Sequence, residues 1–210
     1  MRILLLSSAD PTVGPGTLVM DAKCRLEGEG HEVTIYTKYP VEGHPEVKYI
    51  LPPETKFQSI IRRAKDYYLN HVQKHTFMFF YTKETNPPVD SDLVVGRIEG
   101  EYDMVYIYFI HKLLSFQTIK KLHDKYPVPF VFSGVDNWPF TGGCHFVNDC
   151  NRYEIGCGKC PGIRSLLLKD FTYFNARYRR AVMDEINPIL PCNGATEECY
   201  RNSFVTKGHL

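Results

Sequence analysis

The sequence has no long hydrophobic run, almost no net charge and only one tryptophan. No apolar stretch approaches the roughly 20 residues of a membrane-spanning helix, and the apolar run at 1–6 is too short for a signal peptide. The net charge of +1 gives no bulk attraction to nucleic acid, so we expect no nucleic-acid partner. Without a leader, the expected compartment is the cytoplasm, where seven cysteines favour metal binding or buried thiols over disulfides.

Familiar catalytic and cofactor signatures are also missing. No Ser-His-Asp or paired-carboxylate arrangement can be read from the sequence, and the dinucleotide fingerprint G-x-G-x-x-G is absent because position 19 is valine. A nicotinamide cofactor is therefore disfavoured. Gly14 and Gly16, between the first expected strand and helix, could still bring backbone N–H groups close to a ligand phosphate. A plain turn is the alternative reading.

Short apolar runs alternate with helical patterns along most of the chain. The runs at 2–7, 31–37, 47–51, 103–110 and 129–132 predict strands, and 187–191 predicts a further one. Helical spacing marks the segments 17–28, 55–75, 115–125, 165–185 and 194–204, whereas 76–100 is hard to read. This alternation predicts a Rossmann-like α/β fold, an open and mostly parallel sheet with helices on both faces.

Such a fold places ligands at the carboxyl ends of its strands. Two loops are expected there: 8–16 after the first strand and 133–143 after the strand at 129–132. The second loop leads into a cysteine-rich segment at 136–162, and it is therefore in a position to line a site.

Four cysteines lie within seventeen residues of this segment, in the spacing C-x5-C-x6-C-x2-C. Four thiolates suit a tetrahedral structural zinc site, which would order a loop that has little hydrophobic pattern of its own. His145 could replace one thiol. Unmetallated thiols, disulfides and an iron–sulfur cluster are the alternatives. The expected metal ligands are Cys144, Cys150, Cys157 and Cys160.

The segment 55–75 predicts a basic amphipathic helix. Its apolar side carries Phe57, Ile60 and Ile61 among several lysines and arginines, which would suit peripheral contact with an anionic membrane surface. We favour the alternative, in which this helix packs on the sheet. His71 and His75 are spaced i,i+4 within it, without an evident third metal ligand.

The segment 136–161 resembles bacterial family-4-like glycosyltransferases that build surface polysaccharides. The run Asp136-Asn-Trp-Pro-Phe-Thr-Gly-Gly-Cys-His145 is similar to their motif, and so is the later Cys157-Gly-Lys-Cys-Pro161. Gly30-His-Glu-Val33 and the strand at 103–108 are similar in a more general way. The resemblance implies the N-terminal, acceptor-side domain of the two-domain GT-B architecture, here a single domain over 1–210. The donor domain would then be absent.

The resemblance also implies a reaction and roles for residues. A hexose would move from a nucleotide sugar to a lipid-linked or oligosaccharide acceptor, at the cytoplasmic side of the inner membrane. Asp136 would be the catalytic residue, and the glycines at 14 and 16 would face the donor phosphate. Trp138, Thr141 and Gly142 would line the acceptor pocket, with Trp138 stacking on a sugar or, alternatively, filling the core. By itself the chain should be inactive until a donor-domain partner completes it.

The sequence departs from the family pattern at its histidines. The motif histidine is Val135 here, and the two histidines of the preceding strand are Tyr106 and Tyr108. These departures favour an alternative, namely a non-catalytic module that binds a glycan or a partner subunit. An unrelated small-molecule-binding α/β domain is a third possibility.

Overall fold

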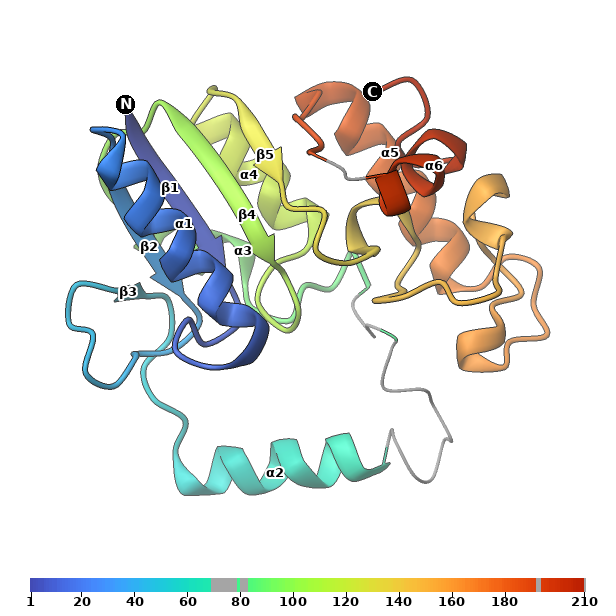
Figure 1. Cartoon of the computed structure of the whole chain (residues 1–210). Coiled ribbons are helices and arrows are strands. Elements are labelled where there is room, and N and C mark those ends of the chain that lie inside the picture. Colours follow the sequence, from blue (N-terminus) through green and yellow to red (C-terminus); the bar gives the residue numbers. More distant parts are fainter. Residues whose placement is uncertain (69–78, 80–82, 192–193, 210) are drawn as a thin grey trace.

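The computed structural model describes residues 1–68, 79, 83–191 and 194–209. Its five strands form one parallel sheet in the order β3-β2-β1-β4-β5 (Figure 1), which confirms the Rossmann-like prediction. The strands are β1 (Arg2–Ser7), β2 (Glu32–Thr37), β3 (Lys48–Tyr49), β4 (Met104–Phe109) and β5 (Phe130–Phe132). The helices are α1 (Thr17–Gly28), α2 (Lys56–Tyr67), α3 (Ser91–Arg97), α4 (Phe116–Lys125), α5 (Phe171–Ile186) and α6 (Gly194–Asn202).

Strand order reverses between β1 and β4. From β1 the chain builds outward through β2 to β3, and it then returns to the other side of β1 to add β4 and β5. In open α/β sheets a crevice forms outside the carboxyl ends of the two strands at such a reversal. In this sheet that position lies between the loops that follow β1 and β4.

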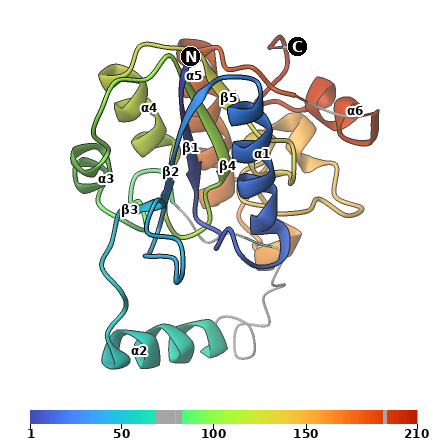
Figure 2. The same ribbon diagram turned by 60° about the vertical axis from the view of Figure 1, so that its left-hand side comes forward.

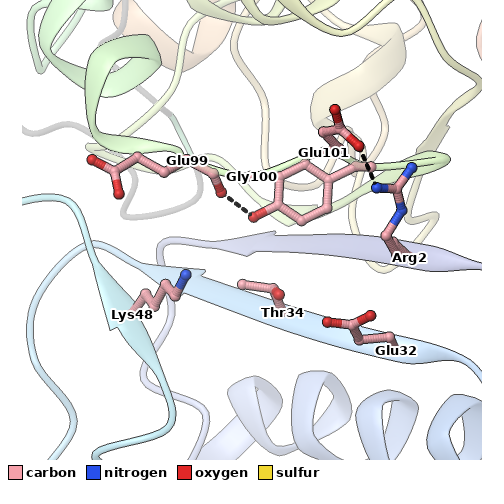
Figure 3. Close-up of a pocket in the computed structure, with 8 residues that line it drawn as sticks. Arg2, Glu32, Thr34, Lys48, Glu99, Gly100 and Glu101 are labelled. Atoms are coloured by element: carbon pink, nitrogen blue, oxygen red, sulfur yellow. Dashed lines mark hydrogen bonds and ion pairs between the residues drawn. The ribbon is translucent and has the colours of Figure 1, made fainter.

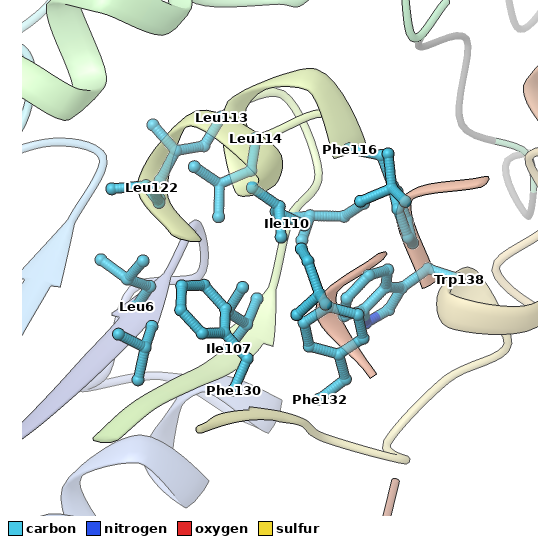
Figure 4. Close-up of a cluster of buried hydrophobic side chains, with 14 of the residues drawn as sticks. Leu6, Ile107, Ile110, Leu113, Leu114, Phe116, Leu122, Phe130, Phe132 and Trp138 are labelled. Atoms are coloured by element: carbon cyan, nitrogen blue, oxygen red, sulfur yellow. The ribbon is translucent and has the colours of Figure 1, made fainter. Parts of the chain in front are cut away.

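Alternation along the central strands explains why helices cover both faces. Ile3 and Leu5 of β1 pack with α1 on one face, while Leu4 and Leu6 point to the other. On that second face α4 packs against α3 and α5 (Figure 2). Figure 4 shows the larger cluster there, which contains Leu6, Ile107, Ile110, Leu113, Leu114, Phe116, Leu122, Phe130, Phe132 and Trp138.

Most expected elements are present, with two corrections and one additional helix. Residues 165–169 are not helical, because the chain enters α5 only after Asp170, whose carboxylate accepts the N–H of Thr172 as an N-cap. The expected strand at 187–191 is a single parallel bridge between Ile189 and Val131 at the sheet edge. The helix α3 lies in the stretch that the sequence pattern left unread.

The helix α2 lies well beyond the carboxyl ends of the strands in both overall views. It begins after a Thr55–Gln58 capping box, and none of its residues is buried. The favoured prediction that it packs on the sheet is therefore wrong. The end of the predicted helix, with His71 and His75, lies outside the described residues. Among the helices that the structure describes, none has the length and apolarity needed to cross a membrane.

Candidate functional site

Polar and cationic side chains gather where the strands end. The two predicted loops start at the carboxyl ends of β1 and β5, as expected. Lys38 follows β2, and His111 and Lys112 follow β4 after one residue. Asp136 lies four residues past β5. The loops that follow four of the five strands therefore contribute residues to this rim of the sheet.

Asp136 and His145 form a hydrogen-bonded pair at this rim. The Nδ1 atom of His145 lies 2.7 Å from Oδ2 of the Asp136 carboxylate, whose Oδ1 accepts the N–H of Trp138 at 2.9 Å. Asp136 is buried, whereas the His145 side chain is 29% exposed. Burial raises the pKa of Asp136, and the hydrogen bond to His145 opposes that rise. Asp136 thus fixes the ring of a histidine that can reach a ligand.

The hairpin between these two residues is locked by its own backbone. The N–H of Asn137 donates to the carbonyl of His145 at 2.8 Å, and the Asn137 side chain accepts the N–H of Val147 at 2.8 Å. Because both bonds flank His145, the histidine is held against the end of β5 without help from the cysteines.

Cationic side chains also follow β2 and β4 at this rim. Lys112 donates to both carboxylate oxygens of Asp66 on α2, at 2.8 and 3.0 Å. Arg62 of α2 contacts Glu54 at 3.0 Å. No ion pair joins Lys38 to a carboxylate among the described residues, and burial, with Lys112 as a further cause, lowers its pKa. The rim therefore carries cations and carboxylates side by side, and Lys38 is the cation without a carboxylate partner within ion-pair distance among the described residues.

Acid sensitivity is the first expected consequence of placing His111 near Lys38 and Lys112. Burial is the main cause that lowers the pKa of His111 to about 4. Lys112, Lys38 and His145 add to this fall, and Asp66 opposes it. The unfolded chain binds this proton near pH 6.5, so stability is lost as pH falls from 6.5 toward 4. Between pH 7 and pH 5, the wild type should lose about 2 kcal/mol of unfolding free energy through His111. In His111→Gln we expect this part of the loss to be absent, as measured by urea unfolding at the two pH values.

The matched control is His44→Gln, in the loop before β3. The wild type and this variant should lose stability in parallel over the same pH range. An equal pH dependence in His111→Gln and the wild type would contradict the cause assigned to the loss.

Trp138 does not line the rim. Its ring is fully buried, with centroids 5.2 Å from the Phe132 ring and 5.8 Å from the Phe116 ring. A side chain without exposed surface cannot stack on a sugar, so the expected stacking role is wrong and the alternative core role holds. The tryptophan packs the loop 136–145, the motif loop, against β5 and α4.

Thr141 and Gly142 are also buried in the scaffold rather than lining a pocket for an acceptor. The Thr141 hydroxyl accepts the N–H of Cys144 at 2.9 Å and closes a tight turn. At Gly142, a Cβ atom would lie 2.4 Å from the carbonyl oxygen of Thr172, so only glycine lets the loop touch α5 this closely. Both residues shape the loop that carries His145.

Gly14 and Gly16 form a single 3-10 turn that leads into α1. A Cβ atom at Gly16 would lie 1.9 Å from the carbonyl oxygen of Asp10, so this glycine is required for the turn itself. Gly14 has a positive φ of 53° and faces open space. Their approach to a donor phosphate stays a prediction.

The four expected metal ligands line one small cavity. Cys144, Cys150, Cys157 and Cys160 all border it, and none of the six described cysteines forms a disulfide. Within the described ranges, however, no three or more His, Cys, Asp or Glu side chains are placed to hold a metal ion. The sulfurs therefore converge without being in ligand geometry.

Two observations bear on whether this donor set suits zinc. The Gly142 N–H donates to the Cys157 sulfur at 3.3 Å, and the Cys160 sulfur accepts backbone N–H groups of Ile163 and Gly162. Such bonds favour thiolates. Burial raises the pKa of the Cys144, Cys157 and Cys160 thiols, that of Cys157 to about 11. Four cysteines at one cavity are the donor type that a structural zinc ion takes, although their sulfurs are not in ligand geometry here, and zinc stays a prediction.

A buried arginine holds the motif loop onto the helices. Arg179 of α5 donates from Nη1 to the carbonyl oxygens of Trp138 and Thr141, both at 2.7 Å. Its Nε donates to Glu84 at 2.8 Å, and both charged side chains are buried. The loop is thus fixed from α5 as well as from the cysteine side.

Tyr106, Tyr108 and Val135, where the sequence resemblance predicts histidines, lie together on one face of the sheet. Tyr106 and Tyr108 stack with centroids 4.5 Å apart and an interplanar angle of 25°. Val135 packs against the same cluster, on the α1 side. These three positions therefore form one cluster of two tyrosines and a valine, and among the described residues the histidines near this rim are His111 and His145.

A second cavity, of about 350 Å³, lies away from this rim (Figure 3). It runs from the amino ends of β1 and β2 to Lys48. Arg2, its most basic group, is already paired with Glu101 at 2.6 Å and Asp103 at 3.0 Å. Internal pairing makes this cavity a poor anion site.

Sequence reasoning missed Lys38, His111 and Lys112, and it considered His145 only as a substitute zinc ligand. A signal was available, since the first three directly follow apolar strand runs and so had to lie at the ligand-binding rim. The Asp136–His145 pair depends on how the motif loop folds back, which the spacing alone does not show.

No family model matches the chain, and a search of curated proteins finds no match.

Proposed function

We propose that this chain is the acceptor-binding half of a GT-B glycosyltransferase of polysaccharide synthesis. The reaction would move a hexose from a nucleotide sugar to a lipid-linked or oligosaccharide acceptor. The observation that carries the proposal is the Asp136–His145 pair, held by the Trp-Pro-Phe-Thr-Gly-Gly loop at the carboxyl rim of a β3-β2-β1-β4-β5 sheet. The sequence resemblance of that loop supports the same reaction.

In this proposal His145 contacts the acceptor and Asp136 is a positioning residue. The partly exposed imidazole would hydrogen-bond the acceptor hydroxyl and orient it, while the buried carboxylate keeps the ring in place. The turn at Gly14–Gly16 would offer backbone to the donor phosphate. Donor binding and departure of the nucleotide would need a donor-domain partner.

We further propose peripheral contact between α2 and an anionic membrane, at the cytoplasmic face of the inner membrane. Phe57, Ile60 and Ile61 are exposed on this helix, and Lys56, Arg63 and Lys65 accompany them. The opposite side of α2 is tied to the rim by the contact of Asp66 with Lys112. This arrangement would place the rim near a lipid-linked acceptor.

The test is acceptor binding by calorimetry, with a short-chain prenyl diphosphate that carries one N-acetylhexosamine. We expect the sugar-bearing compound to bind more tightly than the bare prenyl diphosphate. In His145→Gln, the affinity for the sugar-bearing compound should fall about tenfold, whereas the affinity for the bare prenyl diphosphate should not change. The reason is the loss of one hydrogen bond from a polarised group to the sugar.

His123→Gln, on α4 and packed on Phe130, is the matched control and should bind as the wild type does. Equal affinity for the two compounds, or no effect of His145→Gln, would overturn the acceptor role. Thermal unfolding of each variant separates lost binding from lost folding.

The stacked Tyr106–Tyr108 pair favours a second candidate function. With tyrosines where the family has histidines, the chain could bind a glycan or a partner subunit without taking part in transfer. The substitution Val135→His would then change sugar affinity but create no turnover when a donor domain is supplied.

A further inference from the structure

A loop of three exposed leucines projects between the cysteine cavity and α5. Leu166, Leu167 and Leu168 are 88%, 68% and 70% exposed, so the loop tip is almost entirely apolar. Phe174, in the first turns of α5, is exposed as well. Consecutive exposed leucines cost solubility and do not contribute to the core, which indicates that the tip contacts something outside the chain.

The backbone of this loop is fixed. The N–H of Lys159 donates to the carbonyl of Leu167 at 2.9 Å, and the N–H of Leu167 donates to the Ser165 hydroxyl at 3.2 Å. Gly158 has a positive φ of 86°, and a Cβ there would lie 2.2 Å from the Leu168 carbonyl oxygen. Internal partners for these polar groups lower the cost of moving the tip into a less polar medium.

Cationic residues flank the leucines in the sequence. Lys159, Arg164 and Lys169 are exposed, and the stretch 159–169 contains three cations and no acid. The next residue, Asp170, is buried and turned inward, where it accepts the N–H groups of Cys160 and Thr172. An apolar tip flanked by exposed cations, without an acid in the same stretch, is complementary to an anionic lipid headgroup layer.

The form of the tip favours a membrane over a protein groove. Helices and strands dock on proteins through residues that share one side, at spacings of three, four or two. Leu166, Leu167 and Leu168 are consecutive in a loop that is neither helix nor strand, so they lack the spacing of such a docking face. A fluid hydrocarbon boundary accepts such a tip from every side.

We propose that the loop 164–169 inserts Leu166, Leu167 and Leu168 into an anionic membrane surface, as an anchor separate from α2. This contact is independent of the acceptor-binding proposal, because it concerns vesicle binding and requires no sugar. Two anchors on one chain would also restrict how the rim is oriented above the bilayer.

Tryptophan fluorescence tests insertion directly, because the native Trp138 is buried and gives a constant background. In Leu167→Trp we expect a blue shift on adding phosphatidylcholine vesicles that contain phosphatidylglycerol, and a smaller shift with phosphatidylcholine alone. Co-sedimentation with the same vesicles should fall about tenfold in the triple variant L166S/L167S/L168S.

The variant F57S/I60S/I61S on α2 is the matched comparison. When Leu167→Trp is added to it, the blue shift should remain even where total binding falls. An unshifted signal from the introduced tryptophan, or vesicle binding unchanged in the leucine triple variant, would overturn the anchor. So would a chain that dimerises in solution through the leucines, shown by a triple variant that becomes monomeric in sedimentation.

Discussion

Arg179→Met is expected to lower the free energy of unfolding by about 3–5 kcal/mol. The arginine and Glu84 form a buried ion pair, and removing one partner leaves the other as an uncompensated buried charge. The substitution also removes the donor to the Trp138 and Thr141 carbonyls, which are buried with the loop. Urea unfolding followed by far-UV circular dichroism would measure the loss.

The second part of this prediction concerns Glu84. Its carboxylate also accepts the N–H of Phe116, the first residue of α4, so it connects three segments of the chain. In the double variant E84Q/R179M, the glutamine still accepts that N–H but carries no charge. The double variant should therefore be more stable than Arg179→Met alone.

Arg180→Met is the matched control. Arg180 is the next residue on α5, but its side chain is partly exposed, pairs with Asp184 on the same helix and donates to the carbonyls of Phe204 and Lys207. Partly exposed contacts of this kind contribute little, so the variant should lose about 1 kcal/mol or less. If the two methionine variants were equally stable, Arg179 would not hold the motif loop.

The strands could be predicted because each is a short apolar run closed by turn residues. β1 and β4 are buried on both faces, and continuous apolar runs are the pattern that such strands require. The same logic failed at 165–169, where three leucines mimic a buried helix start. Their exposure shows that the N-cap Asp170, rather than hydrophobicity, decides where α5 begins.

The candidate site was predictable in place but not in detail. Strand ends locate the rim, whereas contacts across long sequence separations decide which groups reach it. Glu84 and Arg179 are 95 residues apart, and Arg179 binds the carbonyls of Trp138 and Thr141, which holds the loop on α5. No spacing rule within the motif encodes that outcome.

Zinc content is expected to be about one ion per chain, with loss of the metal on substituting Cys157 or Cys160 by serine. The four sulfurs already border one cavity, and N–H groups reach the sulfurs of both named cysteines. Structural zinc binding contributes about 10 kcal/mol or more at neutral pH, so the ion would draw the cysteines into tetrahedral geometry. Elemental analysis of purified protein measures the content.

Removal of the metal should let the segment around the cavity open locally while the sheet stays folded. Its own hydrophobic contacts are few, while the sheet keeps its helices without the cysteines. With a strong chelator, we expect proteolysis between 144 and 170 to accelerate at least about tenfold, since local opening no longer costs the zinc bonds. Cys24→Ser, an exposed thiol on α1, should keep both the metal and the protection.

Two results would contradict the zinc site. Purified wild type without bound metal, and with protease resistance unaffected by chelator, would mean that the cavity is closed by packing and the N–H to sulfur bonds alone. Iron with visible absorbance in place of zinc would change the ion but keep the ligand set. His145 is held by Asp136 and the Asn137 backbone, so sugar binding should largely survive the loss of zinc. The leucine loop is held through backbone bonds to Lys159 and Cys160, so its binding to vesicles should be more sensitive to that loss.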